Sequence, residues 1–362
     1  MNFIEQKIAS LLARRVAFSD IHIEASEPLR YRRADGLVAV DRDAVEDGDV
    51  LEFLDLVRGA EQWKQRVEAG GGQYDFSLTL EGVRFRCNLH CFGGSGRHGL
   101  VLRKLDPRIP DLLELGLPAS VLQFLQRRSG LLLVTGPTGS GKSTTLASFI
   151  DYINTQWPYK IITIEDPIEY VHVSKRSMIL QREVGRDVAS FSAGLIASFR
   201  QDPDCILIGE IRDKETISTA LAAAEAGHLV LATLHTAGAV KTVDRITDFF
   251  SGEEKTLVRS VLSSVLLGVI SQALVPRRDG SGRVLAYEIM RNLPAIATHI
   301  REGKTHHIAN AMSTAGIADM QLMHRTLAVM AKAGVIAREE AKRAAYDAQE
   351  LEKELEAKDA VR

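Results

Sequence analysis

The feature that most constrains the fold is an apolar run, a glycine-rich loop and a helical stretch in direct succession. The run Leu131–Thr135 precedes Gly136-Pro137-Thr138-Gly139-Ser140-Gly141-Lys142-Ser143, and the helix-compatible residues Thr144–Ile150 follow it. Glycines in such a loop let backbone amides converge on phosphate groups, and the amino terminus of the next helix adds a partial positive charge. The succession predicts a P-loop, and the alternating strands and helices from about residue 119 predict a mostly parallel sheet with helices on both faces.

The polar side chains of this loop have separate expected roles. We expect Lys142 to place a point charge on the β and γ phosphates of ATP, and Ser143 to offer its hydroxyl to Mg²⁺. The predicted cofactor-binding residues of this segment are Gly136, Pro137, Thr138, Gly139, Ser140, Gly141, Lys142, Ser143 and Thr144. The alternative, a glycine-rich turn that binds nothing, is disfavoured because both flanking elements match the pattern.

Acidic residues follow two further apolar strands. The run Ile161–Ile164 ends in Glu165, and the run Cys205–Ile208 ends in Gly209 and Glu210. In an open parallel sheet, ligands bind at the carboxyl ends of the strands, so we expect both glutamates near the nucleotide. Glu210 there orients the attacking water or holds Mg²⁺ through water.

One position departs from the usual pattern, because Gly209 stands where many P-loop enzymes have Asp. Direct magnesium ligation by a strand-end Asp is therefore not expected. Taken alone, each acidic cluster is equally a helix cap or a surface turn. Their order behind a P-loop favours the functional interpretation of Glu165 and Glu210.

The stretch Gly227–Thr236 is typical of another strand, with a histidine near each end. His235 falls at the carboxyl end, where it is predicted to sense the γ phosphate or polarise the site, and His228 joins the cofactor-binding candidates. A histidine at a strand end is also commonly a hydrogen-bonded structural residue, and that alternative stays open for His235.

Chain length predicts two domains, because 362 residues exceed the size at which one core usually grows. We predict a small α+β domain over residues 1–105, a proline-bearing linker over 106–118, and the P-loop domain over 119–362. Within the last domain, the chain is expected to become helical after about residue 255. The final segment, 338–362, has few apolar residues and predicts a solvated or frayed helix.

Charge and cysteine usage narrow the function class and the compartment. A net charge of -2 gives no global positive field for nucleic acid or an anionic membrane. The three cysteines, Cys87, Cys91 and Cys205, fit a reducing compartment, and no apolar run is long enough to span a bilayer. We therefore expect a cytoplasmic protein. Zinc at Cys87, His90 and Cys91 is disfavoured because a fourth ligand is missing.

The small domain contributes candidate arginines. In the predicted strand Val83–Leu89, the alternation puts Arg84 and Arg86 on the face opposite the core. The glycine-rich stretch Gly93–Gly99 predicts a hairpin or mobile loop, with Arg97 as its one residue worth testing.

Together these segments resemble the type II/type IV secretion ATPases, and among them most closely the retraction ATPases of twitching motility, the PilT class. The resemblance rests on four motifs in the family's order, its Walker A, Asp box, Walker B and His box, which are Gly136 to Ser143, Ile162 to Tyr170, Ile206 to Asp213 and Gly227 to Thr236. It implies a RecA-like P-loop motor domain, preceded by a PAS-like amino-terminal domain and ending in a helical carboxyl-terminal portion.

The resemblance also implies site residues and partners. Glu165 is then the general base and Glu210 its Walker B partner, while Arg86, Arg97 and Arg103 are candidate arginine fingers. The implied assembly is a homohexamer that uses ATP and Mg²⁺. It would bind an inner-membrane pilus platform protein at the cytoplasmic face of the inner membrane, associate peripherally with the membrane machinery, and make no direct contact with nucleic acid.

Two absences favour retraction over assembly within that family. No cysteine follows Cys205, so the four-cysteine zinc module of the assembly members is missing, and there is no room for their extra amino-terminal domain. Against this, the stretch Ala295–Glu302 keeps only the ends of the retraction signature Ala-Ile-Arg-Asn-Leu-Ile-Arg-Glu. An accessory retraction ATPase, a secretion or assembly ATPase, a RecA-like nucleic-acid motor and a non-catalytic nucleotide-binding regulator remain the alternatives.

Overall fold

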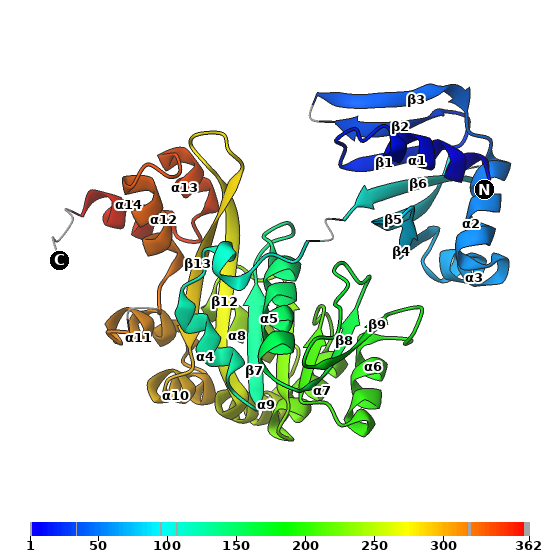
Figure 1. Ribbon diagram of the computed structural model, residues 1–362. Coiled ribbons are helices and arrows are strands. Elements are labelled where there is room, and N and C mark those ends of the chain that lie inside the picture. Colours follow the sequence, from blue (N-terminus) through cyan, green and yellow to red (C-terminus); the bar gives the residue numbers. More distant parts are fainter. Residues whose placement is uncertain (1, 34, 95, 106–107, 318–319, 358–362) are drawn as a thin grey trace. The chain divides into compact units, whose positions relative to one another are not determined.

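The computed structural model describes residues 2–33, 35–94, 96–105, 108–317 and 320–357 (Figure 1). It divides into two compact units, one of Met1–Arg108 with Asp166–Val171, the other of Ile109–Glu165 with His172–Arg362. Parts of three predictions lie outside the described residues: Ser95 in the glycine-rich loop, 106–107 in the linker, and 358–362 in the final helix. The predicted domain bounds stay a prediction.

The first unit is a six-stranded antiparallel sheet with helices on one face, in the strand order β3-β2-β1-β6-β5-β4. Its elements are α1 (Phe3–Ala13), β1 (Asp20–Glu24), β2 (Pro28–Arg33), β3 (Gly36–Ala44), α2 (Asp47–Arg58), α3 (Ala60–Ala69), β4 (Gln73–Leu80), β5 (Val83–Phe92) and β6 (Arg97–Lys104). Phe85, Cys87 and Leu89 of β5 are fully buried against apolar residues of α1 and α2. The predicted alternation of β5 is therefore confirmed, although β6 begins at Arg97, inside the stretch predicted to be a loop.

The second unit is built on a seven-stranded sheet in the order β13-β12-β7-β11-β10-β8-β9. All neighbours in it pair in parallel except β12 and β13. Its strands are β7 (Gly130–Thr135), β8 (Lys160–Glu165), β9 (Met178–Glu183), β10 (Cys205–Ile208), β11 (Leu229–Leu234), β12 (Leu266–Pro276) and β13 (Arg283–Arg291).

Helices cover both faces of this sheet. They are α4 (Leu122–Leu125), α5 (Lys142–Gln156), α6 (Phe191–Ser198), α7 (Lys214–Glu225), α8 (Ala239–Asp248), α9 (Gly252–Val265), α10 (Pro294–Glu302), α11 (Ile308–Thr314), α12 (Met323–Lys332), α13 (Arg338–Ala344) and α14 (Ala348–Glu356). Short 3-10 turns occur at Leu112–Leu115, Ala119–Val121, Phe199–Gln201 and Thr305–His307.

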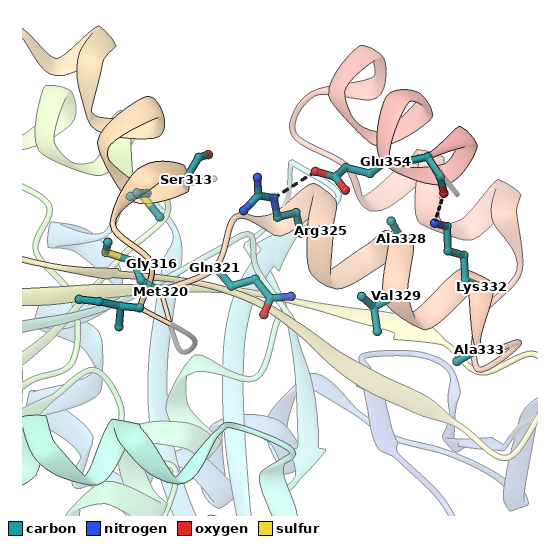
Figure 2. A pocket seen from close by; sticks show the side chains of 13 residues that line it. Ser313, Gly316, Met320, Gln321, Arg325, Ala328, Val329, Lys332, Ala333 and Glu354 are labelled. Carbon is teal, nitrogen blue, oxygen red and sulfur yellow. Dashed lines mark hydrogen bonds and ion pairs between the residues drawn. The ribbon is translucent and has the colours of Figure 1, made fainter. Parts of the chain in front are cut away.

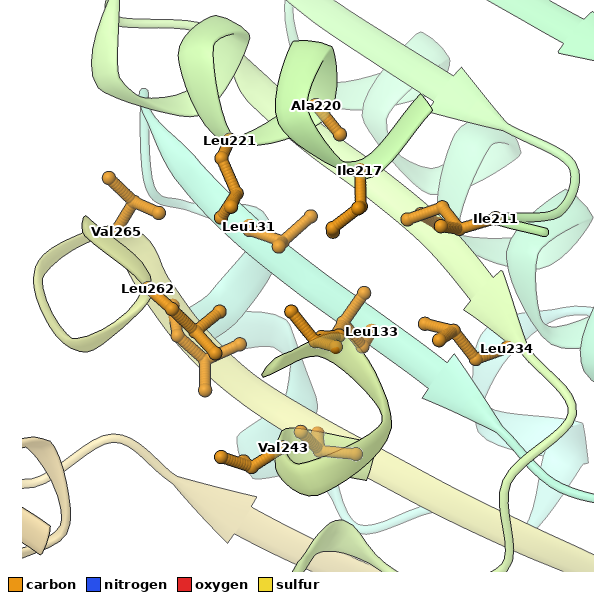
Figure 3. Close-up of a cluster of buried hydrophobic side chains, with 14 of the residues drawn as sticks. Leu131, Leu133, Ile211, Ile217, Ala220, Leu221, Leu234, Val243, Leu262 and Val265 are labelled. Carbon is orange, nitrogen blue, oxygen red and sulfur yellow. The ribbon is translucent and has the colours of Figure 1, made fainter. Parts of the chain in front are cut away.

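The central strands β7, β10 and β11 are buried along their whole length, as parallel strands with helical crossovers require. Along β7, Leu131 and Leu133 pack with α7, α8 and α9, as Figure 3 shows, while Leu132 and Val134 pack with α4 and α5 on the other side. Continuous burial therefore fixes the carboxyl end of β7, and with it the start of the glycine-rich loop, against two layers of helices.

The expectation of a helical chain after residue 255 is wrong for β12 and β13. α9 ends at Val265, and the chain then forms the strand Leu266–Pro276, which pairs in parallel with β7 and antiparallel with β13. An apolar run buried on both faces does not reveal its period, so the sequence does not separate such a strand from a buried helix.

The carboxyl-terminal helices are packed rather than solvated in the described residues up to 357. Ala341 of α13 and Leu351 and Leu355 of α14 are buried in a cluster with Leu327 of α12 and Val275 of β12. The prediction of a frayed, solvated helix is therefore wrong for α13 and α14. Among the helices of the described residues, none combines the length and hydropathy that a bilayer crossing demands.

Candidate nucleotide-binding site

The glycine-rich loop connects β7 to α5 and closely approaches the neighbouring strand β12. Gly136 has φ +144°, and a Cβ built on it would overlap the backbone oxygen of Gln272. Gly139 and Gly141 have φ +78° and +88°, in the left-handed region that favours glycine. The loop therefore depends on glycine for its backbone conformation. It leads directly into α5, whose first residue is Lys142.

Lys142 folds back over the loop. Its Nζ donates to the carbonyl oxygens of Gly136 at 2.9 Å and Pro137 at 3.0 Å, although the side chain is only 8% exposed. The same ammonium lies 3.5 Å from Nδ1 of His235, which in turn lies 3.5 Å from Oγ1 of Thr138. A buried ammonium beside a glycine-rich loop at the start of a helix is typical of a site for phosphate oxygens.

The structure brings Glu210 and His235 together beside this loop. His235 Nε2 lies 3.2 Å from one carboxylate oxygen of Glu210, and Arg212 donates to the other at 2.8 Å. Burial acts to raise the pKa of Glu210, but the hydrogen bond and charge of Arg212, together with His235, outweigh it and lower that pKa below its usual value. Glu210 is therefore an anion at neutral pH.

Glu165 ends β8, beside the strand that leads to Glu210. Thr163 donates its hydroxyl to Oε1 of Glu165 at 2.6 Å, and Gln181 Nε2 of β9 donates to the same oxygen at 3.1 Å. These two donors fix the carboxylate on the edge of the sheet from which the phosphate loop also departs. A positioned carboxylate of this kind is a candidate general base.

The structure explains Gly209, which departs from the usual P-loop pattern. A Cβ built there would lie 3.2 Å from the carbonyl oxygen of Ile164 and 3.3 Å from Cα of Glu165. The Gly209 amide donates to that carbonyl at 2.8 Å, and its own carbonyl accepts from the Thr233 hydroxyl. A side chain at this position therefore needs the backbone of β8 to shift by a few tenths of an ångström, which favours glycine here.

The structure does not bring His228 to the phosphate loop, and its assignment to the nucleotide site of a single chain is wrong. Leu229 pairs with Gly130, the first residue of β7, whereas the phosphate loop follows the last residue, Thr135. His228 therefore lies at the amino end of the sheet. There its Nδ1 bonds to the carbonyl oxygen of Pro203 at 2.8 Å, and its ring stacks on Phe199.

All three candidate arginine fingers belong to the first unit. Arg86 and Arg103 face each other across β5 and β6, and Arg103 bonds to Asp20 at 2.9 Å. Arg86 forms an ion pair of 3.3 Å with Glu169, and the guanidinium of Arg97 lies 5.1 Å from the centroid of the Phe92 ring. Their role as fingers stays a proposal.

Gln272, a fully buried residue of β12, is not among the residues that the sequence predicts for this site. Its Nε2 donates to the carbonyl oxygen of Ser140 at 2.8 Å, and its Oε1 accepts from the Thr145 hydroxyl at 3.1 Å. It thus clamps the loop to the first turn of α5. An amide inside the apolar run 266–276 is the signal that marks it, because buried polar groups need partners.

One other hollow of the second unit, away from the phosphate loop, has different chemistry. A hollow of about 860 Å³ lies among α11, α12 and α14, where Arg325 is paired with Glu354 and Lys332 donates to the carbonyl of Ala357 (Figure 2). No residue of the phosphate loop lines it. Over the residues that the structure describes, no group of His, Cys, Asp and Glu side chains has the arrangement of a metal site, and Cys87 is buried in the core.

Comparison with known proteins identifies the chain's family. The family described as type II/IV secretion system protein matches residues 1–359. The chain belongs to this family. Type IV pilus retraction ATPase PilT of Pseudomonas aeruginosa is 43% identical over 325 residues, which cover 90% of this chain and 93% of PilT. A twitching motility protein of Neisseria gonorrhoeae is 47% identical over 280 residues, covering 77% and 74% of the two chains.

A solved member of the family has the same fold as this secretion-family chain. The crystal structure of the pilus retraction motor PilT with bound ADP matches with a TM-score of 0.86 and 44% identity, covering 98% of this chain and 99% of the other. The predictions of the family and of the fold class, a RecA-like P-loop domain behind a small α+β domain, are therefore confirmed.

Proposed function

We propose that this chain is an ATP-hydrolysing motor subunit that powers retraction of a type IV pilus. One observation carries the proposal: Lys142, His235 and Glu210 converge beside a glycine-rich loop that holds the shape of a phosphate cradle. The relatives named as a pilus retraction ATPase and a twitching motility protein support the choice of a pilus motor, as does the bound ADP of PilT for the nucleotide.

The loop and Lys142 hold the phosphates. The ammonium of Lys142 now bonds to two loop carbonyls, and phosphate oxygens replace these acceptors with little movement because the loop surrounds the same position. The amides of the loop and the amino terminus of α5 add donors and positive potential. Binding energy and charge neutralisation come from the same groups.

The strand-end carboxylates act on the water. We propose that Glu165, fixed by Thr163 and Gln181, accepts the proton of the attacking water. Glu210 holds the His235 side chain close to Lys142 and Thr138. In this position we propose that the imidazole senses the γ phosphate. Glu210 thus acts on the reaction in part through His235.

The oxygen donors beside the loop fit Mg²⁺, which prefers hard oxygen ligands and keeps several waters. The hydroxyl of Ser143, an exposed residue, would hold the ion, which would supply positive charge against the phosphates. Both oxygens of Glu210 already have partners, Arg212 and His235, so we assign this carboxylate an outer role through water.

We further propose that the chain works as a homohexamer bound to an inner-membrane platform protein, at the cytoplasmic face of that membrane. In such a ring, Arg86, Arg97 and Arg103 of the first unit are candidates to complete the nucleotide site of a neighbouring subunit. Guanidinium groups stabilise the charge of phosphoryl transfer and are typically supplied in this way.

Magnesium-dependent phosphate release tests the enzyme part of the proposal. Lys142→Ala and Glu210→Gln are expected to lose turnover by roughly 10²–10³-fold, the usual cost of one preorganised electrostatic group. His228→Ala is the matched control, because this histidine lies at the other end of the same strand. Wild-type rates in Lys142→Ala would refute the proposal.

Piliation of cells tests the direction of the motor. Cells that lack the gene, or that carry Lys142→Ala, are expected to have excess surface filaments and no twitching movement. Bare cells would instead indicate an assembly motor, and unchanged filaments with slower or weaker retraction would indicate an accessory retraction ATPase.

A further inference from the structure

A buried row of polar residues crosses the sheet at the end of β7. Thr135 of β7 is the register partner of Ser271 in β12, and Ser271 is the register partner of Glu288 in β13. Thr135 and Ser271 are fully buried, and Glu288 is 6% exposed. Burying a carboxylate and two hydroxyls is costly unless each has hydrogen-bond partners, so their partners indicate what the row is for.

The Glu288 carboxylate caps two helices at once. One oxygen accepts from the amide of Ala239, the first residue of α8, at 2.6 Å, and the other accepts from the amide of Met323, the first residue of α12, at 3.1 Å. Neither helix has a side-chain cap from its own preceding residue, Gly238 or Leu322. A single strand residue thus provides a hydrogen-bond acceptor to the amino termini of both helices.

Ser271 and Tyr346 extend the same connection. The Ser271 hydroxyl accepts from the Gly238 amide at 3.0 Å and lies 3.0 Å from the hydroxyl of Tyr346, in the turn between α13 and α14. Gly238 has φ +96°, and a Cβ built there would lie 3.3 Å from the Tyr346 ring and 3.5 Å from Glu288. The backbone at Gly238 is therefore enclosed by residues from β13 and from the carboxyl-terminal helices.

The segment that this cluster holds is the one that carries His235. Only two residues separate His235 from Gly238, and one of them, Thr236, bonds to Thr242 of α8 at 2.7 Å. His235 itself contacts Glu210 and lies near Lys142 and Thr138 of the phosphate loop. A shift of His235 on nucleotide binding therefore acts on the amides that Ser271 and Glu288 hold.

At the other end of the connection, α12 lies on the surface. Arg325, Ala328, Val329 and Lys332 of this helix line the hollow shown in Figure 2, and Val329 is 63% exposed. Thr326 gives α12 a second bond, to the Tyr287 carbonyl at 2.7 Å, which does not involve the His235 segment.

From these contacts we propose that Glu288, assisted by Ser271 and Tyr346, is a positioning residue that transmits the state of the nucleotide site from the His235 segment to α12. The proposal rests on the nucleotide-binding role of the phosphate loop given above. Glu288 touches no substrate in it. Its two oxygens link the amino termini of the two helices, so a movement of one helix acts on the hydrogen bond to the other.

Hydrogen–deuterium exchange of the assembled full chain, with and without Mg-ADP, tests the link. In the wild type, ADP is expected to slow exchange at the start of α12 by at least about fivefold, the lower end of usual coupling between sites. Glu288→Gln keeps the shape of the side chain but replaces one carboxylate oxygen by an NH₂ group. That group is a donor and cannot accept from the helix amide that it faces, of Ala239 or of Met323. We expect this variant to lose the ADP response of α12 while its ADP affinity stays within about threefold of the wild type.

Two further variants separate the link from a simple loss of structure. Tyr346→Phe keeps the ring and removes only the hydroxyl, and it is expected to weaken the ADP response of α12 without unfolding the helix. Thr326→Val removes the bond from α12 to the Tyr287 carbonyl and is expected to keep the response, because it leaves Glu288 untouched.

An unchanged ADP response in both Glu288→Gln and Tyr346→Phe, or its absence in a wild type that binds ADP, would overturn the inference. A response lost equally in Thr326→Val would overturn it too, because any weakening of α12 would then suffice. ADP binding and the exchange of α12 do not require turnover. Phosphate release measured on the same samples therefore separates a failure of this inference from a failure of the ATPase proposal.

Discussion

The two histidines of β11 lie at opposite ends of one strand and have different surroundings. His235, at the carboxyl end, contacts Glu210 and lies within 3.5 Å of both Lys142 and Thr138. His228, at the amino end, bonds to the Pro203 carbonyl and stacks on Phe199. His235 thus belongs to a cluster of charged side chains, whereas His228 packs against a loop and hydrogen-bonds to it.

The comparison extends to the whole sheet of the second unit. The phosphate loop, Glu165, Glu210 and His235 all follow the carboxyl ends of strands, because parallel strands bring these ends to a single edge. At the amino edge, Asp204 bonds to the Lys160 amide at 2.8 Å, and His228 supports the loop before β10. We conclude that the end of the strand, more than residue type, decides which polar groups act on a nucleotide.

The largest effect is expected from the carboxyl edge at Glu165. Glu165→Gln keeps the hydrogen-bonding shape and removes the base, so kcat should fall by roughly 10²–10⁴-fold while ATP still binds. Steady-state phosphate release and equilibrium ATP binding on one preparation measure the two quantities. Asp204→Asn is the matched amino-edge variant and should leave kcat within about twofold. Equal losses in both would remove the difference between the edges.

A smaller effect is expected from His235. His235→Ala leaves the cradle and Glu165 intact but frees Glu210 from one partner. We expect kcat to fall by roughly 10- to 100-fold. This loss is smaller than the roughly 10²–10³-fold that follows removal of one oxyanion-hole donor. The matched measurement is kcat of His228→Ala. If His228→Ala lost as much as His235→Ala, position along the strand would not be the deciding factor.

The carboxyl edge should also have its own pH dependence of stability. Because the pKa of Glu210 is lowered in the folded protein, its ionised form stabilises the fold above the ordinary value of 4.5, and this contribution disappears as the pH falls through the lowered pKa. The ionised Glu210 adds about 1 kcal/mol or less to the free energy of unfolding, since Arg212 is half exposed. Thermal unfolding of wild type and Glu210→Gln between pH 3 and 7, a range set by that usual carboxylate value, should differ at the upper end and converge at the lower end.

The smallest effect on catalysis is expected from His228. His228→Ala removes one hydrogen bond to a backbone carbonyl and one ring stack, which contributes roughly 0.5–1.5 kcal/mol to stability. Denaturant unfolding should show that loss, whereas KM and kcat for ATP stay within about twofold. A large change in KM would return His228 to the nucleotide site.

Much of this arrangement follows from the sequence because it is local. The strand, loop and helix around Gly136–Ser143 are specified by consecutive residues, and period two places His235 at the carboxyl end of its strand. The same counting places His228 at the amino end. Its assignment to the nucleotide site therefore went beyond what the pattern supports.

Other features depend on contacts between distant segments and are not readable locally. Glu165 is held by Gln181 of another strand, and the loop is clamped by Gln272 from β12, a strand that the apolar run 266–276 does not distinguish from a helix. The backbone of β8 passes close to Gly209 and favours a glycine there. Each of these needs the sheet order, which puts β8 beside β10 and β12 beside β7.

The central claim is that the carboxyl edge of the sheet binds a nucleoside triphosphate through the amides of the loop and the ammonium of Lys142. The most direct test is equilibrium binding of ATP with Mg²⁺ to the purified chain, with Lys142→Ala and His228→Ala beside it. We expect saturable binding of one nucleotide per chain, lost in Lys142→Ala and kept in His228→Ala. No binding by the wild type, or equal binding by Lys142→Ala, would contradict the account.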